Sequence, residues 1–399
     1  MSLLDVAPII EQMLLVSDKV SDLNFSTNQK PQVEINGVLY PASPIGLGKL
    51  TAFQTEMIAM SLMRDNPDAA SQLFRTRTAD LSYALPGKCR FRVNIFQQRN
   101  SFSIVMRVIP HQVPTFEDLR LPSQLAEIAG IRNGVVLLTG PTGSGKTSTL
   151  AAIIDRINDT KAYHIVTIED PIEFLHTHKK STINQREVGS DTKDFASALR
   201  AALRQAPKVI LVGEMRDLET AEIALEAAET GHLVLSTLHT IDASKTIDRI
   251  VGLYPKNEER IIRTRLAQTF RFIVSQRLIP TADGKGRVAA VEILKSNPRT
   301  REYIEKGETE GKSLLDAIRD GEIDGMQDFD SVILEMIQSQ KITMDDGLSF
   351  ATNKNNLLLQ LKGLSSTEDY ANAGRPKPMI NPVAPPPPQN PDSVLNMIE

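Results

Sequence analysis

The stretch of residues 140–147 reads GPTGSGKT and fits the phosphate-binding pattern G-x-x-x-x-G-K-[ST]. An apolar run, VVLL at 135–138, comes just before it, and residues 148–157 alternate apolar and polar side chains at helical spacing just after it. Phosphate binding needs a buried strand, a glycine turn and a helix start, because glycines let backbone N–H groups point inward and the helix amino end adds partial positive charge. This order of elements predicts a nucleoside triphosphate site.

The positions of the glycine-rich stretch have predicted parts in that site. The Lys146 ammonium reaches the β- and γ-phosphates, and the Thr147 hydroxyl binds Mg²⁺. ATP and Mg²⁺ are therefore the expected ligands. The predicted nucleotide-binding residues are Gly140, Pro141, Thr142, Gly143, Ser144, Gly145, Lys146, Thr147 and Ser148.

The composition restricts the classes of protein that remain. The chain has 399 residues, which suggests two or three domains, and a net charge of −4, which offers no overall basic field for nucleic acid or an anionic membrane. Its single cysteine, Cys89, excludes an intramolecular disulfide and a cysteine-based zinc site. Residues 1–20 lack the pattern of a signal peptide, and no run approaches the ~20 apolar residues of a membrane span. We therefore expect a cytoplasmic protein.

Residues 1–112 predict a small α+β domain. Helical patterns occupy residues 9–15 and 50–65, and the alternation of residues 33–40 around an Asn-Gly pair predicts a hairpin. Two further strands are expected at 91–96 and 102–109. Prolines at both ends make residues 110–114 a predicted linker.

Residues 115–363 predict a second domain with a parallel sheet. Apolar strands alternate with helical segments, which is typical of a parallel sheet covered on both faces. The segments 258–278 and 313–361 predict an α-helical extension. The tail, 364–399, is rich in proline and is expected to be disordered, with an apolar tip at 394–398 that either frays or docks on a partner. The expected strands are 135–138, 164–168, 209–212 and 233–235, and the expected helices are 148–158, 195–204 and 219–230.

Two acidic clusters follow predicted strands of this sheet. Ligands of such sheets bind at the carboxyl ends of the strands, so Glu169 and Asp170 are expected near the triphosphate. The alternative is a turn or helix-capping pair. Gly213 and Glu214 follow the strand at 209–212, where Glu214 is placed to polarise the attacking water. The alternative for Glu214 is a surface glutamate paired with Arg216.

Polar groups also follow the strand at 233–235. Ser236, Thr237 and His239 are candidates to hydrogen-bond the γ-phosphate or its water, whereas His232 precedes the strand at its opposite end. A structural role is the alternative for each histidine.

The arginines of the first domain are candidates to neutralise charge in the transition state. Arg90, Arg92 and Arg107 lie far along the chain from Lys146. They reach a nucleotide only if the protein closes into a ring and each N-terminal domain contributes to a neighbour's site. By spacing alone, a solvated strand face is the better interpretation.

Together these residues resemble a known family. GPTGSGKTSTL, TIEDPIEF followed by NQREVG, ILVGEMRDLETAEIALEAAETGH and LSTLHT look like the Walker A, Asp box, Walker B and His box of secretion-type ATPases. The resemblance is nearest to type IV pilus retraction ATPases of the PilT/PilU branch and covers roughly residues 5–362. It implies an α/β fold: a RecA-like P-loop ATPase core with a parallel sheet, a PAS-like α+β domain before it and a helical extension after it.

The resemblance also implies roles for particular residues. Glu214 matches the catalytic glutamate of Walker B, and Glu169 matches the Asp-box glutamate, a ligand of Mg²⁺ directly or through water. His232 and His239 match the two histidines of the His box. Arg92 and Arg107 match arginine fingers that act in trans.

A biological role follows from the same resemblance. It implies a homohexameric ring with ATP at subunit interfaces, peripheral to the inner membrane. Domain rotation on ATP turnover would act on an inner-membrane pilus platform protein and power pilin removal and twitching motility, with a paralogous retraction ATPase as a further partner.

Two departures from the family pattern keep alternatives open, and one of them is the proline-rich tail, 364–399, which lies outside the shared pattern. The stretch PRTREYIE at 298–305 stands where retraction motors commonly carry AIRNLIRE, which leaves room for an accessory PilU-like motor. Type II or type IV secretion and pilus-assembly ATPases share the site chemistry, but assembly ATPases usually have an extra N-terminal domain and a four-cysteine insertion. A RecA-like nucleic-acid translocase is disfavoured by the acidic balance and the absence of tryptophan. A small-molecule kinase lacks any signal for an acceptor pocket or lid.

Overall fold

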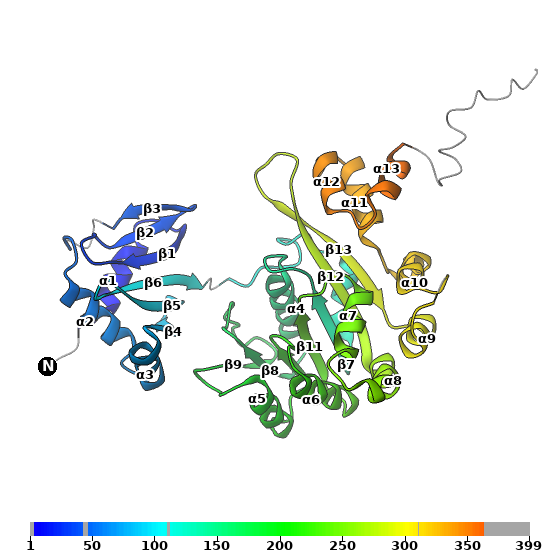
Figure 1. Cartoon of the computed structure of the whole chain (residues 1–399), viewed down its shortest axis with the longest axis horizontal. Coiled ribbons are helices and arrows are strands. Elements are labelled where there is room, and N and C mark those ends of the chain that lie inside the picture. The colour runs from blue at the N-terminus through cyan, green and yellow to red at the C-terminus, as the bar shows by residue number, and fades with distance from the viewer. Residues whose placement is uncertain (1–3, 43–46, 110–111, 310, 363–399) are drawn as a thin grey trace, which may run out of the picture.

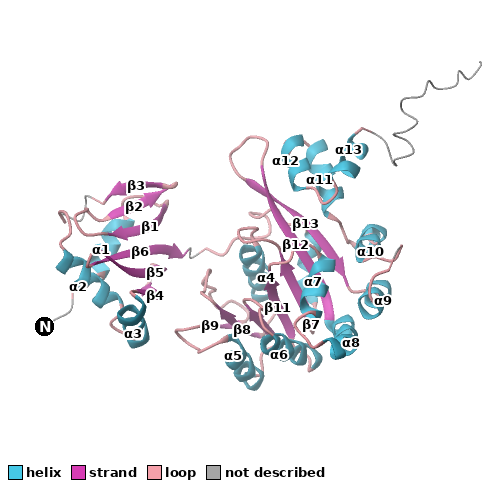
Figure 2. Ribbon diagram, in the orientation of Figure 1, coloured by secondary structure: helices cyan, strands magenta, loops and turns pink. Residues whose placement is uncertain are grey.

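Two β-sheets organise residues 4–42, 47–109, 112–309 and 311–362, the part of the chain that this computed structural model describes (Figures 1 and 2). The first sheet belongs to the N-terminal domain, and the second forms the core of the larger domain. The predicted tail, 364–399, and residues 110–111 of the predicted linker lie outside the described residues.

The N-terminal sheet is antiparallel, with the strand order β3-β2-β1-β6-β5-β4. The predicted hairpin is confirmed, because Ile35 pairs with Val38 and the turn residues Asn36 and Gly37 have φ of 52° and 80°. One face of the sheet is buried under the helices and the other carries polar side chains. The elements are α1 (Ala7–Leu14), β1 (Val20–Phe25), β2 (Gln32–Ile35), β3 (Val38–Pro41), α2 (Ala52–Leu62), α3 (Pro67–Thr76), β4 (Thr78–Leu85), β5 (Cys89–Gln98) and β6 (Ser101–Ile109).

The second sheet has the order β13-β12-β7-β11-β10-β8-β9 and is parallel except for β13. Its central strands are buried on both faces, which explains their continuous apolar runs. Val135 and Leu137 of β7 pack on one face, and Val136 and Leu138 pack on the other. The strands are β7 (Gly134–Thr139), β8 (His164–Glu169), β9 (Thr182–Glu187), β10 (Val209–Val212), β11 (Leu233–Leu238), β12 (Phe270–Pro280) and β13 (Arg287–Lys295).

Helices cover both faces of this sheet. The α4 helix lies on one face with the 3₁₀ segment Ser123–Gly130, and α5 to α8 lie on the other (Figure 1). The predicted α/β class is therefore confirmed. These helices are α4 (Lys146–Thr160), α5 (Phe195–Ala202), α6 (Leu218–Glu229), α7 (Ala243–Val251) and α8 (Glu259–Thr269).

The predicted helix over residues 258–278 is wrong in its second half. The chain leaves α8 at Thr269 and continues as β12, which pairs with β7 on one side and β13 on the other. Most residues from Phe270 to Gln276 are buried on both faces of the sheet, so this run has no alternation of polar and apolar side chains. A short apolar run of that kind does not distinguish a buried strand from a buried helix.

The C-terminal extension is helical, as predicted for residues 313–361. The helices α11 to α13 pack on the ends of β12 and β13 through Ile279, Val288 and Ala290. Among the described residues, no helix combines the length and the apolar character that crossing a membrane requires. The helices are α9 (Pro298–Lys306), α10 (Leu314–Asp320), α11 (Phe329–Gln338), α12 (Met344–Phe350) and α13 (Lys354–Leu361).

A buried carboxyl group on β13 makes the stability of the core depend on pH. Burial, with a contribution from Asp242, raises the pKa of Glu292 to about 7, although the Ala243 N–H donates to its Oε1 at 3.0 Å. Between its ordinary pKa and this raised value, Glu292 ionises in the unfolded chain but stays protonated in the folded one. Stability is therefore lost as pH rises toward and through 7.

We expect Glu292→Gln to remove this loss. The variant should be more stable than the wild type by roughly 1–3 kcal/mol at pH 8 and nearly equal to it at about pH 4. Calorimetric unfolding at both values measures the difference, and Glu226→Gln, at an exposed position of α6, is the matched control. An equal gain at both pH values would contradict the assignment.

Candidate functional site

The glycine-rich loop joins the carboxyl end of β7 to the amino end of α4, which begins at Lys146. Gly140 has φ of 142°, and a Cβ there would lie 2.4 Å from the carbonyl oxygen of Gln276 on β12, so only glycine fits. The Lys146 Nζ donates to the carbonyl oxygens of Gly140 at 2.7 Å and Pro141 at 3.0 Å. Burial lowers the pKa of Lys146, while the charge of Glu214 acts in the opposite direction. The lysine is thus held inside the curve of the loop.

A cavity of about 290 Å³ lies between this loop and the carboxyl ends of the neighbouring strands. Residues of β8, β10 and β11 and of the loop after β7 contribute to the wall, as expected for a sheet of this type. The chemically active residues that line it are Thr142, Lys146, Thr147, Thr167, Glu169, Asp170, Glu173, His176, Glu214, Arg216, Thr237 and His239.

Glu169 ends β8 and points at two hydrogen-bond donors. The Thr167 hydroxyl donates to its Oε1 at 2.6 Å, and the Gln185 amide donates to the same atom at 3.1 Å. Burial nevertheless raises the pKa of Glu169, and the hydrogen bonds oppose that rise. The carboxyl group is therefore held in a fixed direction in the cavity wall.

Glu214 follows β10. It lines the cavity, as one interpretation of the sequence expected, and it also pairs with Arg216, as the alternative expected. Its Oε2 lies 2.7 Å from a guanidinium nitrogen of Arg216, and its Oε1 lies 3.4 Å from Nε2 of His239. Burial acts to raise the pKa of Glu214, but the hydrogen bond and charge of Arg216, with His239, hold it below its ordinary value. The side chain is therefore an ionised carboxylate, paired and also facing the cavity.

Gly213, which precedes Glu214, lies close to the end of β8. The Gly213 N–H donates to the carbonyl oxygen of Ile168 at 2.8 Å, and a Cβ at 213 would lie 3.3 Å from that oxygen. A side chain at this position would therefore need the ends of β10 and β8 to move apart by a few tenths of an ångström.

The polar groups of β11 divide between the cavity and the interior. Thr237 and His239 line the cavity, and the Thr237 hydroxyl donates to the Gly213 carbonyl at 2.6 Å. Ser236 is buried, and its hydroxyl has no hydrogen-bond partner in the described part of the chain. His232 lies at the opposite end of β11, where its Nδ1 contacts the Ala227 carbonyl at 2.9 Å. His232 does not line this cavity, and its role stays a prediction.

The two predicted arginine fingers lie side by side on the N-terminal sheet. Arg92 of β5 is directly opposite Arg107 of β6 in the strand register. Arg107 pairs with Asp22 at 3.0 Å and leaves 69% of its side chain exposed, whereas Arg92 lies 3.9 Å from Glu173 with 52% exposed. Neither side chain lines the cavity around Lys146 in its own chain.

The remaining positions of the glycine-rich stretch face two adjoining hollows. Gly145 and Ser148 line a cavity of about 930 Å³, together with Gln276 of β12. Pro141 and Ser144 line another of about 540 Å³. Gln276, whose Oε1 accepts the Thr149 hydroxyl at 3.0 Å, was not among the predicted site residues, because the sequence of its strand was interpreted as a helix.

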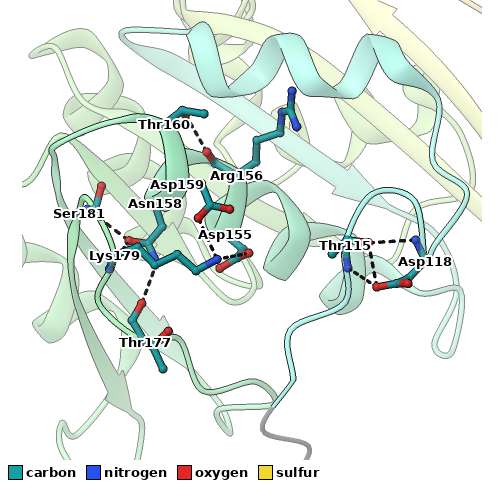
Figure 3. A network of polar contacts seen from close by, with 10 residues as sticks. All are labelled: Thr115, Asp118, Asp155, Arg156, Asn158, Asp159, Thr160, Thr177, Lys179 and Ser181. Carbon is teal, nitrogen blue, oxygen red and sulfur yellow. Dashed lines mark hydrogen bonds and ion pairs between the residues drawn. The ribbon is translucent and has the colours of Figure 1, made fainter.

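The loop after Glu169 is braced against the far end of α4 (Figure 3). The fully buried Asn158 side chain accepts the N–H groups of Lys179 at 3.1 Å and Ser181 at 3.3 Å and donates to the Thr177 carbonyl at 2.8 Å. Lys179 adds ion pairs to Asp155 and to Asp159. The segment between β8 and β9 is therefore fixed to α4, the helix that begins at Lys146.

Removing this brace should be costly. We expect Asn158→Ala to lower the free energy of unfolding by about 2–4 kcal/mol, because buried backbone groups lose their partners. Calorimetric unfolding measures the loss. Thr160→Ala, at an exposed position two residues along α4, is the control, with an expected change within about 0.5 kcal/mol. Equal changes in the two variants would exclude the brace.

The cavity has the oxygen donors that Mg²⁺ prefers, although it is no ready-made metal cage. Thr147 and Glu169 both line it. Across residues 4–42, 47–109, 112–309 and 311–362, no group of three or more His, Cys, Asp or Glu side chains is placed to hold an ion. This donor set fits Mg²⁺, which usually binds one or two protein oxygens and completes its shell with water and phosphate.

Comparisons with known proteins identify the family of the chain. A family model described as type II/IV secretion system protein matches residues 77–344. The type IV pilus retraction ATPase PilT of Pseudomonas aeruginosa is 42% identical over 339 residues, which cover 84% of this chain and 96% of that protein. The type IV pilus ATPase PilU of the same organism is 37% identical and covers 90% of this chain and 92% of its own. A crystal structure of the pilus retraction motor PilT with bound ADP matches with a TM-score of 0.79 at 40% identity, covering 88% of this chain and 98% of that one.

The fold and the cavity define a P-loop ATPase. The chain belongs to the type II/IV secretion system protein family, within which it is of the PilT/PilU type. The family resemblance in the sequence is thereby confirmed.

Proposed function

We propose that this ATPase powers type IV pilus retraction as a homohexameric ring. The observation that carries the proposal is the convergence of Lys146, Glu169, Glu214 and His239 on one cavity, in a chain of the PilT/PilU type. The crystal structure of the pilus retraction motor PilT with bound ADP supports nucleotide binding by this chain.

The residues of the cavity have distinct parts in hydrolysis. Lys146 leaves the two loop carbonyls to neutralise the β- and γ-phosphates of ATP. Glu214, kept ionised by Arg216, orients the attacking water and accepts its proton. His239 contacts Glu214 and senses the γ-phosphate. Thr147 and Glu169 would hold Mg²⁺, which neutralises charge on the phosphate oxygens when bound.

The nucleoside extends from the phosphates toward the cavity of about 930 Å³ at Gly145 and Ser148. Ser148 lies in the first turn of α4, where the helix amino end favours the α-phosphate. The volume of this cavity is ample for a ribose and a purine base.

Arg92 and Arg107 act on the nucleotide of a neighbouring subunit. Both side chains are half exposed or more and lie on one face of the sheet, and neither lines the cavity of its own chain, although Arg92 lies 3.9 Å from Glu173 in the cavity wall. His232, at the other end of β11, is proposed to act at the same interface. A ring supplies these groups in trans without any change of fold.

Mixing inactive subunits tests the arginines. Lys146→Ala and Arg107→Ala proteins should each be inactive alone, and random mixing should restore activity at about a quarter of the interfaces. The restored sites combine an intact Lys146 with an intact neighbouring Arg107; Arg92→Ala is tested in the same way. Failure of mixed rings to recover any ATPase activity would place the arginines in the site of their own chain.

Hydrolysis is coupled to movement of the N-terminal domain against the core. The moving ring acts on an inner-membrane pilus platform protein, from the cytoplasm and peripheral to the membrane. The stretch PRTREYIE forms most of α9, where Thr300, Tyr303 and Ile304 are buried. Because this stretch departs from the principal motors, the second form of the proposal is an accessory motor that works with a paralogous ATPase.

Deletion of the gene in the source organism tests the proposal. Excess surface pili without twitching motility, restored by the wild-type chain but not by Lys146→Ala, is the expected result. Absent pili would assign an assembly role instead, and normal pili with failed protein export would assign secretion. Strong stimulation of the purified ATPase by DNA would favour the translocase alternative.

A further inference from the structure

A single buried carboxylate joins the N-terminal domain to the loop after Glu169. Glu187 ends β9, and only 4% of its side chain is exposed. The Ser82 hydroxyl of β4 donates to its Oε1, and a guanidinium nitrogen of Arg90 on β5 lies 3.2 Å from its Oε2. From the other side, the Ile172 N–H donates to the same Oε2 at 3.2 Å. We name these four residues the Glu187 latch.

The Glu187 latch lies next to a residue of the cavity wall, Glu169. β8 and β9 are parallel, and Glu169 is directly opposite Glu187 in their register. Ile172 is buried and belongs to the 170–176 loop, in which Asp170, Glu173 and other residues line the cavity. The position of the Ile172 backbone therefore sets the loop that flanks Glu169.

A buried carboxylate makes this contact sensitive to the position of the domain. A charge removed from water needs charged or hydrogen-bonding partners, and Arg90 is the cation that Glu187 contacts. If the N-terminal domain moved away, Glu187 would lose both Arg90 and Ser82 and keep only neutral donors, Ile172 and Ser190, whose hydroxyl lies 3.3 Å away. The carboxylate would then turn toward water and release the Ile172 N–H.

The surroundings of the latch suit a contact that opens and closes. A polar cavity of about 620 Å³ lies between the domains beside Glu187, lined by Arg92, Asp170 and the 187–193 turn. Water therefore reaches this part of the interface, as is usual where domains move relative to one another.

We propose that Glu187 is a positioning residue that couples docking of the N-terminal domain to the order of the 170–176 loop. Docking through Arg90 and Ser82 fixes the loop beside Glu169, and undocking releases it. The consequence for turnover rests on the proposed role of Glu169, whereas the coupling itself rests only on the contacts.

Hydrogen–deuterium exchange of the full-length protein tests the coupling. Arg90→Gln changes the N-terminal domain, yet it should raise exchange at least about fivefold in peptides that cover residues 170–176 of the core. Glu187→Gln should give the same result, and the double variant should be no worse than either single one, because both remove one interaction. Arg75→Gln, an exposed arginine on α3, is the control and should leave this exchange unchanged.

Kinetics of the same variants separate positioning from nucleotide binding. Arg90→Gln and Glu187→Gln should lower kcat about tenfold with KM for ATP changed less than about twofold, because the glycine-rich loop is untouched. Ser82→Ala removes only the hydroxyl donor to the same carboxylate. It should also raise exchange at residues 170–176 and lower kcat, and it provides the test if Arg90→Gln fails to fold.

Unchanged exchange at 170–176 in Arg90→Gln, or additive effects in the double variant, would overturn the proposal. Since exchange is measured without turnover, these outcomes are independent of the proposed function. If the variants show the expected exchange but the wild-type protein has no role in pilus retraction, the coupling stands and only the proposed function is contradicted.

Discussion

Lys146→Ala is expected to abolish ATP turnover, with a loss of at least about 10²–10³-fold in kcat. The Lys146 ammonium is held inside the glycine-rich loop by two backbone carbonyls, at the amino end of α4. Alanine removes the mobile positive charge nearest the phosphates, and the loop N–H groups alone do not compensate for it. Binding of the triphosphate should weaken as well, because the same charge acts before and during hydrolysis.

Two measurements separate the loss of binding from a loss of folding. Saturating ATP should raise the unfolding temperature of the wild type, since a ligand that binds only the folded state stabilises it by about 2.7 kcal/mol at 100 times its Kd. Lys146→Ala should keep the unfolding temperature of the free protein but lose this increase. Lys161→Ala, at the opposite end of α4, is the matched control and should behave as the wild type. Full nucleotide-induced stabilisation of Lys146→Ala would remove the lysine from the site.

The sequence predicted the site better than it predicted the edges of the sheet. The strands β7, β8, β10 and β11, whose carboxyl ends lead to the predicted site residues, are short apolar runs, because both faces of a central parallel strand are buried. Since the carboxyl ends of such strands share one edge, the convergence of these residues on one cavity was predictable from the order of the motifs, and their catalytic roles stay predictions.

Two of the strands that the sequence did not predict, β9 and β12, lacked a local signal. The β9 strand is a polar run in which only Ile183 and Glu187 are buried, and its pairing with β8 is decided by tertiary contacts. The β12 strand has the opposite difficulty, because burial on both faces removes its alternation. Both strands carry residues that matter for the site, Gln276 on β12 and Glu187 on β9.

Contacts between the two domains also could not be predicted from local residue patterns. The sequence favoured a solvated strand face for Arg90, but the Arg90 side chain is only 20% exposed and contacts Glu187 of the second domain. A contact between segments about one hundred residues apart leaves no period in either one. The role of Arg92 and Arg107 in a ring therefore depends on the proposed assembly and not on the fold of a single chain.

Glu214→Gln should retain ATP binding and lose about 10²–10⁴-fold in turnover, the usual contribution of a general base. The amide keeps the shape of the side chain and one hydrogen-bond acceptor for Arg216, but it no longer accepts a proton from water. Because the charge of Glu214 acts on Lys146, its removal should leave the affinity for the anionic triphosphate unchanged or slightly higher. The expected signature is therefore a fall in kcat without a rise in the Kd of ATP.

Glu219→Gln is the matched control, since Glu219 is an exposed glutamate of α6 that also pairs with an arginine, Arg200. It should turn over ATP at the wild-type rate. Arg216→Gln tests whether the ion pair alone explains the effect: it leaves the Glu214 carboxylate in the cavity and should cost much less than Glu214→Gln. Normal turnover by Glu214→Gln would move the catalytic role to Glu169, the other carboxyl group held in a fixed direction in the cavity wall. The same comparison in Glu169→Gln would then decide between the two, because only the general base should lose turnover while the Kd of ATP stays constant.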